Sequence, residues 1–372
     1  MRAPKKVALV HDWLTGQRGG EKVLEVLAEL FPEAPVYTLF HLRGSQAPDI
    51  ENRTIHTSVL QKMPLARTKY RSYLPFYPLA VELFDLQDYD LVISSSHCAA
   101  KGIIPRPDAL HVSYIHSPMR YAWNAYHTYF SGARLGPLSR WVVPPVVHYL
   151  RLWDESSSSR TDVFVANSRN VARRIAKYYR RRAAVIPPPV DTEFFRPGPE
   201  KTEDYFLIVS ALVPYKRIDR AVALFNRTGR ELRVVGSGPD LKRLKKEARP
   251  NIRFLGSLAP EDLLRTYRRA RAFLQPWEED FGIAVLEAQA CGVPVAAYGR
   301  GGAAETVLHG RTGILYDEPT AAGLGEALDN LERLPFNKTA ARNNAMRFSR
   351  KIFKNRMSRF ISRAWAEKAG ST

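Results

Sequence analysis

Two glutamates with a defined spacing mark the second half of the chain. Residues 276–287 read PWEEDFGIAVLE, with seven residues between Glu279 and Glu287, and they follow the apolar run RAFLQ. A helix that begins near Phe281 would turn its first backbone N–H groups, including that of Gly282, toward a phosphate or a sugar hydroxyl. Glu279, in the loop before this helix, could accept from substrate hydroxyls. Glu287, inside the helix, could accept from two hydroxyls of a ribose.

The same segment has a structural alternative. Residues 278–280 could simply be acidic residues at a helix N-terminus, and Glu287 could lie on a solvated face. The run GIAVLEAQACGVPVAAY around Glu287 is strongly apolar, however. A glutamate in such surroundings is unlike one on a solvated face, so we interpret both carboxylates as functional.

Histidines at the ends of apolar runs are candidates in the first half. His116 ends the run HVSYIH, where a residue that faces a ligand would lie, but a histidine there is as often a core or surface residue. His97 in SSSHCAAKG also follows an apolar run, and this segment reads equally well as a helix N-terminus.

The elements that must position these residues alternate between strand and helix. Short apolar runs separated by helical patterns fill the chain up to residue 179, a proline-rich break covers residues 185–205, and the alternation then resumes. The pattern predicts an α/β fold class with two Rossmann-like domains that face each other across a cleft. We expect the domains to be residues 1–189 and 190–349, with a final basic helix, 350–372, packed back on the first.

Composition excludes several classes of protein. The chain has 372 residues, ordinary apolar content of 45% and two cysteines, so it is neither disordered nor built on disulfides. The apolar run at the start is too short for a signal sequence, and no stretch is long enough to span a membrane. The net charge of +19 indicates nucleic acid, an anionic membrane or a phosphate-bearing substrate as partner.

The Glu-x7-Glu segment after a strand ending in Pro276 resembles the signature of retaining GT-B glycosyltransferases of family 4. Other segments match in the same order: RGGEKV, SYIHSPMRYAW, SALVPYKRID, VVGSGPDLKRL, GGAAETV with Glu305, and HGRTGILYD. The resemblance implies catalytic roles for His116, Lys216 and Glu279. It implies that the donor contacts Gly19, Gly20, Arg217, Gly236, Gly238, Asp280, Phe281, Gly282, Ile283 and Glu287, and it leaves Asp12, Trp13, Arg120 and Tyr121 as acceptor-side candidates.

One position departs from the family pattern. The family commonly has an arginine five residues before the lysine, and both contact the donor diphosphate, but Ala211 stands there. Arg217 or Arg18 is a candidate replacement. Lys216 alone would act as a point charge rather than as a chelating group.

The resemblance also implies a reaction. A nucleotide sugar would bind the second domain, an acceptor would approach from the first, and the sugar would move with retention through a front-face mechanism. No Asp-x-Asp motif lies in a suitable loop, so we expect neither a metal nor another cofactor. The motifs are most similar to bacterial mannosyltransferases of O-antigen and exopolysaccharide assembly, which suggests GDP-mannose as donor and a polyprenyl-diphosphate-linked glycan as acceptor. A UDP-sugar donor is the alternative.

The positive charge concentrates in three segments, 62–71, 173–182 and 347–363. Cations beside aromatic and apolar residues suit an anionic membrane surface, so we hypothesise peripheral binding through residues 62–84, at the inner face of the cell membrane. Ordinary solvated faces are the alternative.

The residues alone leave two rival functions open. A nucleic-acid-binding protein would explain the charge, with Tyr178 and Tyr179 to stack on bases, but no nucleic-acid module is recognisable and we expect no such partner. An epimerase or a phosphorylase-like enzyme would share the fold.

Overall fold

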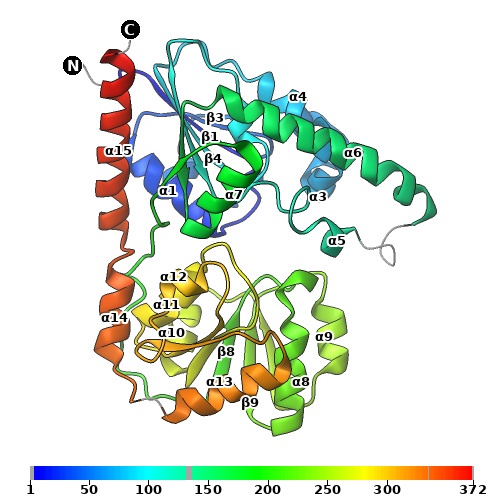
Figure 1. The fold of residues 1–372 in the computed structure, drawn as a ribbon, viewed down its shortest axis with the longest axis vertical. Helices are drawn as coiled ribbons and strands as arrows, with labels where there is room; N and C mark the ends of the chain where they lie inside the picture. Colours follow the sequence, from blue (N-terminus) through cyan, green and yellow to red (C-terminus); the bar gives the residue numbers. More distant parts are fainter. Residues whose placement is uncertain (1–3, 131–135, 334, 371–372) are drawn as a thin grey trace. The chain divides into compact units, whose positions relative to one another are not determined.

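The computed structural model describes residues 4–130, 136–333 and 335–370. It divides into two compact units: unit 1 is Met1–Pro189 with Lys351–Thr372, and unit 2 is Val190–Arg350. Each unit is a parallel sheet covered by helices (Figure 1), which confirms the predicted fold class of two Rossmann-like α/β structures. Within the described residues, no helix combines the length and apolarity needed to cross a bilayer.

The sheet of unit 1 has seven parallel strands in the order β3-β2-β1-β4-β5-β6-β7. The chain order reverses between β1 and β4, so their carboxyl ends open on a natural ligand site. The strands are β1 (Val7–His11), β2 (Val36–Thr38), β3 (Ile55–Thr57), β4 (Leu91–Ser96), β5 (Leu110–Ile115), β6 (Val163–Ala166) and β7 (Ala183–Val185).

Helices cover both faces of this sheet, which explains why its central strands are apolar throughout. Alternate residues of β1 illustrate the two layers, since Leu9 packs in one core cluster and Val10 in the other. The helices are α1 (Gly19–Leu30), α2 (Pro48–Glu51), α3 (Ala66–Lys69), α4 (Tyr77–Glu82), α5 (Tyr126–Tyr129), α6 (Pro137–Ser156), α7 (Arg169–Tyr179) and α15 (Arg350–Gly370).

The last helix, α15, lies beside α1 in unit 1 (Figure 1). Phe353, Met357 and Ile361 recur at helical spacing, are buried, and join the core cluster that contains the inner face of α1. An ion pair between Lys354 and Glu29 adds a polar contact at this junction. The chain therefore returns to its first unit after completing the second.

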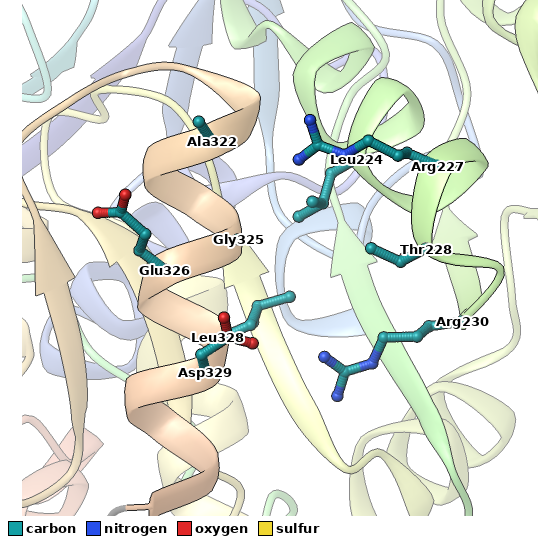
Figure 2. Close-up of a pocket in the computed structure, with 9 residues that line it drawn as sticks. All are labelled: Leu224, Arg227, Thr228, Arg230, Ala322, Gly325, Glu326, Leu328 and Asp329. Carbon is teal, nitrogen blue, oxygen red and sulfur yellow. The ribbon is translucent and has the colours of Figure 1, made fainter.

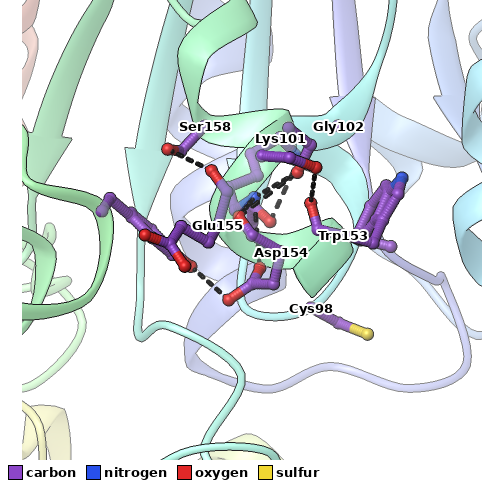
Figure 3. Close-up of polar contacts among 12 residues, drawn as sticks. Cys98, Lys101, Gly102, Trp153, Asp154, Glu155 and Ser158 are labelled. Atoms are coloured by element: carbon purple, nitrogen blue, oxygen red, sulfur yellow. Dashed lines mark hydrogen bonds and ion pairs between the residues drawn. The ribbon is translucent and has the colours of Figure 1, made fainter. Parts of the chain in front are cut away.

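A buried ion pair fastens α6 to the loop after β4 (Figure 3). Lys101 Nζ lies 3.1 Å from Asp154 Oδ1 and donates to Ser157 Oγ at 2.6 Å, and the exposed fractions of Lys101 and Asp154 are 1% and 0%. The other oxygen of Asp154, Oδ2, accepts from Trp123 Nε1 at 2.7 Å and from the Tyr179 hydroxyl at 2.9 Å. Buried charges persist only when they are paired and hydrogen-bonded, so this network fixes the C-terminal third of α6.

The sheet of unit 2 has six parallel strands in the order β10-β9-β8-β11-β12-β13, with the reversal between β8 and β11. The strands are β8 (Tyr205–Val209), β9 (Glu231–Val235), β10 (Ile252–Gly256), β11 (Ala272–Gln275), β12 (Val295–Tyr298) and β13 (Gly313–Tyr316). The helices are α8 (Ile218–Thr228), α9 (Leu241–Glu247), α10 (Pro260–Arg269), α11 (Ile283–Ala290), α12 (Ala303–Thr306), α13 (Ala321–Arg333) and α14 (Lys338–Met346).

The helix expected near Phe281 begins later, at Ile283. Gly282 is the residue before its first turn and has φ +91°, a left-handed conformation that glycine adopts without strain. The chain therefore turns sharply at Gly282 before the helix can start, which leaves Phe281 outside it.

Candidate active site

Lys216 and Glu279 meet at the carboxyl edge of the sheet in unit 2. Lys216 ends a short 3₁₀ turn, Pro214–Lys216, after β8, and Glu279 follows the neighbouring strand β11. Lys216 Nζ lies 3.0 Å from Glu279 Oε2, which also accepts from Trp277 Nε1 at 3.0 Å. The same ammonium lies 5.1 Å from the centre of the Trp277 ring. A cation and a carboxylate are thus held side by side where sheets of this type bind ligands.

Gly236 and Gly238 bring two loops of unit 2 together. A Cβ on Gly236 would lie 1.9 Å from the carbonyl oxygen of Ser210, and one on Gly238 would lie 2.2 Å from that of Leu212. Leu212 N donates to Ser237 O at 2.8 Å across the same contact. Both glycines are required here by backbone packing, which holds the loop after β9 against the loop that leads to Lys216.

The turn into α11 is also tightly built. A Cβ on Gly282 would lie 3.1 Å from Gln275 Oε1, and its φ of +91° disfavours any other residue. Phe281 is 3% exposed and its ring packs against Phe348 at 5.7 Å, while Ile283 packs on the same cluster. The Phe281 side chain therefore serves the core, and a ligand could reach only its backbone. Asp280 is also buried in this turn.

Glu287 lies inside unit 2 rather than on a solvated face. It is 5% exposed, and the Tyr267 hydroxyl of α10 donates to its Oε2 at 2.9 Å. Burial and the adjacent carboxylate raise the pKa of Tyr267 well above its usual value, so this donor keeps its proton. The alternative of a solvated Glu287 is thereby excluded.

Arg217, the candidate replacement at the Ala211 position, has another partner. Its guanidinium contacts both carboxylate oxygens of Asp219, with Nη2 at 2.9 Å from Oδ2, and that hydrogen bond raises the pKa of Arg217. Arg217 itself adopts φ +45° as α8 begins. The charge of Arg217 is thus paired within its own turn, whereas the ion-pair partner of Lys216 is Glu279, the other predicted site residue.

Three histidines gather at the carboxyl edge of the sheet in unit 1. His11 ends β1, His97 follows β4 and His116 follows β5, with ring centres 6.0–6.4 Å apart. Ser95 Oγ lies 3.1 Å from His11 Nδ1 and 2.8 Å from His116 Nε2. A hydroxyl has one hydrogen to donate, so Ser95 couples the tautomers of the two rings. Burial lowers the pKa of His11 to about 4 and that of His116 well below 6.5, so both are neutral at pH 7.

The carboxylate of Asp12, an acceptor-side candidate, is fully occupied by hydrogen bonds to the loop after β4. Its exposed fraction is 0%, and its carboxylate accepts from the backbone N–H groups of residues 97–100 at 2.6–3.0 Å. Oδ2 also lies 3.0 Å from His97 Nδ1. Asp12 would thus act on an acceptor through His97 rather than by direct contact.

Gly19 and Gly20 begin α1 beside these histidines. A Cβ on Gly20 would lie 3.3 Å from His11 Cε1 and 3.6 Å from His116 Nε2, so glycine permits the close approach of helix and rings. Glu21 Oε2 accepts from Arg18 N at 3.1 Å and closes the first turn. Trp13, 8% exposed, meets the His97 ring edge-on at 4.4 Å.

The remaining candidates lie just after β5. The Tyr121 hydroxyl contacts Cys98 Sγ at 2.8 Å, and burial raises its pKa well above 10, so it stays protonated. Arg120 accepts from Ala125 N through its backbone carbonyl at 2.8 Å.

A surface hollow in unit 2, between α8 and α13 (Figure 2), contains none of the candidate residues; it is lined by Leu224, Arg227, Thr228, Arg230, Ala322, Gly325, Glu326, Leu328 and Asp329.

Two family descriptions match the chain on either side of its midpoint. Residues 18–194 match Glycosyltransferase Family 4, and residues 189–350 match Glycosyl transferases group 1. Together they cover Gly19 and Gly20, two of the three clustered histidines (His97 and His116), Lys216 and both glutamates. The chain belongs to glycosyltransferase family 4. The resemblance proposed from the motifs is therefore confirmed.

Curated relatives of this glycosyltransferase share about a third of the aligned residues. The GDP-mannose-dependent alpha-(1-6)-phosphatidylinositol monomannoside mannosyltransferase of Mycobacterium tuberculosis is 33% identical over 202 residues, which cover 46% of this chain and 52% of the relative. The D-inositol 3-phosphate glycosyltransferase of Thermobispora bispora is 33% identical over 240 residues, which cover 53% of this chain and 55% of the relative. The chain thus spans about half the length of the curated relatives that it matches.

Solved structures support the GT-B fold of this glycosyltransferase. Sucrose-phosphate synthase from Thermosynechococcus elongatus superposes with a TM-score of 0.72 at 16% identity, covering 98% of this chain and 100% of that one. Anabaena HepE in complex with UDP and glucose superposes with a TM-score of 0.71 at 16% identity, covering 96% of this chain and 99% of that one. At such identities the likeness concerns the fold alone.

Several residues of the glycosyltransferase site were not singled out by the sequence pattern. Trp277 and Tyr267 fix the two glutamates, and His11 and Ser95 fix His116. A polar residue that closes an apolar run is the signal that could have found His11 and Ser95. His97, which the sequence left open, lies in a loop rather than at the start of an α-helix.

Proposed function

We propose that this glycosyltransferase moves mannose from GDP-mannose, with retention of anomeric configuration, to a lipid-linked or oligosaccharide acceptor in bacterial surface polysaccharide assembly. The Lys216–Glu279 ion pair is the observation that carries the proposal, since it offers a phosphate cation and a hydroxyl acceptor 3.0 Å apart. It lies in the part of the chain that matches group 1 glycosyl transferases. The mannose donor is supported by the relatives whose names include GDP-mannose.

The residues of unit 2 suit the charge that develops in glycosyl transfer. As the bond between the anomeric carbon and the diphosphate oxygen breaks, negative charge accumulates on the diphosphate, and the Lys216 ammonium stabilises it. Glu279, released from Lys216, accepts from a hydroxyl of the sugar. The new bond forms from the acceptor oxygen on the same face, and the acceptor proton passes to the departing diphosphate.

The residues around α11 suit recognition of the nucleotide. Glu287 is fixed by Tyr267 and can receive the two hydroxyls of a ribose, as its place one to two turns inside the helix predicts. The first N–H groups of α11 and the turn at Gly282 suit a phosphate oxygen or a sugar hydroxyl. Neutral His116 in unit 1 suits a hydrogen bond to the sugar.

Donor choice is tested by calorimetric titration of the protein with GDP-mannose and UDP-glucose separately. If the site takes a guanosine donor, GDP-mannose binds at least tenfold more tightly than UDP-glucose. Glu287→Gln should weaken binding of GDP-mannose, whereas substitution of the exposed Glu326 by glutamine should not. Binding of the uridine donor alone would overturn the mannose assignment.

We also propose that the enzyme binds the inner face of the cell membrane, where a polyprenyl-diphosphate-linked acceptor would be presented. The supporting feature is a basic apolar face on α3, α4, α6 and their connections, which lie on one side of unit 1 (Figure 1). Trp153 Nε1 of α6 donates to Glu82 of α4 at 2.8 Å, so these two helices adjoin. The face consists of exposed Val59, Met63, Leu65, Phe76, Leu79, Leu83, Trp141, Val142, Tyr149 and Leu152 with exposed Lys62, Arg67, Lys69 and Arg71.

Two properties of the basic apolar face favour a membrane over a solvated surface. Trp141 is 84% exposed on a helix whose C-terminal third is fixed by the Lys101–Asp154 pair. Residues 52–81 contain no acidic residue, so all the charged side chains in this part of the face are positive. Apolar side chains beside cations match the interface of an anionic bilayer.

Co-sedimentation with vesicles tests the membrane proposal. We expect recovery with phosphatidylglycerol vesicles to exceed recovery with phosphatidylcholine vesicles, and Trp141→Ser with Leu152→Ser to abolish most of it. Leu255→Ser, which changes an exposed leucine of unit 2, is the matched control. Equal recovery with both lipids would contradict the proposal.

A further inference from the structure

The hydroxyl of Ser95, on β4, lies between two histidine rings of unit 1. Its Oγ is 3.1 Å from His11 Nδ1 and 2.8 Å from His116 Nε2, and both Ser95 and His11 are buried. Burial, followed by the electrostatic effect of His97, lowers the pKa of His11 to about 4 and that of His116 well below 6.5. Each ring therefore carries a single N–H hydrogen at pH 7, and the hydroxyl carries one more.

Only two arrangements of these three hydrogens satisfy both contacts. In the first, His11 Nδ1–H donates to Ser95, the Ser95 hydroxyl donates to His116 Nε2, and His116 has its own hydrogen on Nδ1. In the second, His116 Nε2–H donates to Ser95, Ser95 donates to His11 Nδ1, and His11 has its hydrogen on Nε2. The two arrangements differ in what His116 Nδ1 presents, which is an N–H group in the first and a lone pair in the second.

The start of α1 favours the first arrangement. A Cβ on Gly20, in the first turn of this helix, would lie 3.6 Å from His116 Nε2 and 3.8 Å from His11 Nε2. A helix N-terminus carries a positive partial charge, which attracts a nitrogen lone pair and repels an N–H group. Both Nε2 atoms are lone pairs in the first arrangement and N–H groups in the second, so the helix stabilises the first at both rings.

Two further observations agree with this assignment. His11 Nε2 is buried and has no hydrogen-bond partner within the described ranges of the chain. In the second arrangement it would be a buried N–H group directed at the positive end of a helix, without an acceptor. Hydroxyl donors also form shorter hydrogen bonds than N–H donors, and the shorter contact of Ser95, at 2.8 Å, is the one to His116.

His116 differs from His11 in that its second nitrogen is accessible. The residue is partly exposed, and its Nδ1 is not one of the buried polar atoms of unit 1. No residue that the structure describes forms a hydrogen bond with this nitrogen. An N–H group on Nδ1 is therefore able to donate to a ligand.

We propose that Ser95 and His11 are positioning residues that hold His116 as the tautomer with its hydrogen on Nδ1, so that His116 presents an N–H donor to an oxygen of the donor sugar. The identity of the ligand rests on the proposed function, whereas the tautomer rests on contacts within unit 1. His116 can then accept no hydrogen bond from the sugar, because its other nitrogen already accepts from Ser95.

NMR spectroscopy of the ligand-free, full-length protein with ¹⁵N-labelled histidine tests the tautomer, because protonated and unprotonated ring nitrogens differ in ¹⁵N chemical shift. At pH 7 we expect His116, identified by the loss of its signals in His116→Gln, to show a protonated Nδ1 and an unprotonated Nε2. Ser95→Ala should convert it into a mixture of both tautomers. Ser95→Thr, which keeps the hydroxyl, should restore the single form.

Ser94→Ala is the matched control for the loss of a buried hydroxyl. Ser94 is as buried in β4 as Ser95, but its hydroxyl contacts His111 and Ser113 instead. We expect this variant to keep the His116 tautomer and the parent kcat/KM. In Ser95→Ala, kcat/KM should fall about three- to tenfold, in proportion to the fraction of His116 that still has its hydrogen on Nδ1. Ser95→Thr should recover it.

Two results would overturn the proposal. One is a hydrogen on Nε2 of His116 in the parent protein, and the other is a tautomer that Ser95→Ala leaves unchanged. Because the tautomer is measured without a ligand, a failure to transfer mannose would contradict the proposed function and not the role of Ser95.

Discussion

At the scale of single residues, the proposed transfer depends on the pairing of Lys216 with Glu279. The two side chains are 13% and 21% exposed, and both are polar groups outside the hydrophobic core clusters of unit 2. Substitution by alanine should therefore affect transfer far more than folding. Because each residue holds the other, their effects should not be additive.

We predict that Lys216→Ala lowers kcat/KM about 10²–10³-fold, the usual cost of removing a group that stabilises developing negative charge. Glu279→Ala should lower it strongly as well, and the double variant should cost less than the product of the two. Transfer kinetics and melting temperatures measured together provide the check. Lys246→Ala, an exposed lysine of α9, serves as control. Full activity in Glu279→Ala would remove Glu279 from the site.

The burial of single residues was easier to predict from the sequence than the contacts between residues. The burial of Glu287 followed from its apolar neighbours, and the structure agrees. The contact between Lys216 and Glu279 could not be foreseen, because it depends on β11 lying next to β8 although β9 and β10 intervene in the chain. The same holds for Ser95, which reaches His11 and His116 only because β4 lies between β1 and β5.

At the scale of elements, a buried ion pair contributes to the attachment of α6, beside the apolar residues that α6 packs into the core. We predict that Lys101→Met lowers the free energy of unfolding by about 3–5 kcal/mol, since Asp154 would be left as an unpaired buried charge. Asp154→Asn added to this variant should recover part of the loss, because the lone charge is removed. Denaturant titrations measure both effects. Equal stability of the parent and Lys101→Met would refute the role of the pair.

The start of α11 shows that the backbone conformation of one glycine can override the apolar pattern of the sequence. The apolar run after residue 281 predicted a helix that begins near Phe281, and the left-handed Gly282 sets its first residue at Ile283. This shift turns the Phe281 side chain into the core, against Phe348. A sequence pattern does not report the sign of φ, so an error of this size is expected at a glycine.

At the scale of the whole molecule, the two units should respond differently to acid. Burial lowers the pKa of His11 and of His111 to about 4, and that of His116 well below 6.5. The unfolded chain, with histidine pKa values near 6.5, then binds protons that the folded unit 1 does not, so stability falls as the pH drops from about 6.5 toward 4. The raised pKa of His97 acts in the opposite direction but is one group against three.

Unit 2 lacks this sensitivity because residues 190–350 contain a single histidine, His309. We predict that the opening free energy of β4 and β5, measured by hydrogen exchange, falls between pH 7 and 5 by up to roughly 1.4 kcal/mol per pH unit for each neutral histidine. Strands β8 and β9 should change much less. His111→Gln should reduce the dependence in unit 1. A parallel fall in both units would contradict the account.

We propose retaining transfer of mannose by this family 4 glycosyltransferase, and its first product tests that proposal. The most direct measurement is NMR spectroscopy of the first product formed from GDP-mannose and a polyprenyl-diphosphate-linked glycan. We predict a new mannosyl residue with the α configuration of the donor, and a rate of transfer that falls about 10²–10³-fold in Lys216→Ala. A β-mannosyl product, or transfer from UDP-glucose but not from GDP-mannose, would contradict it.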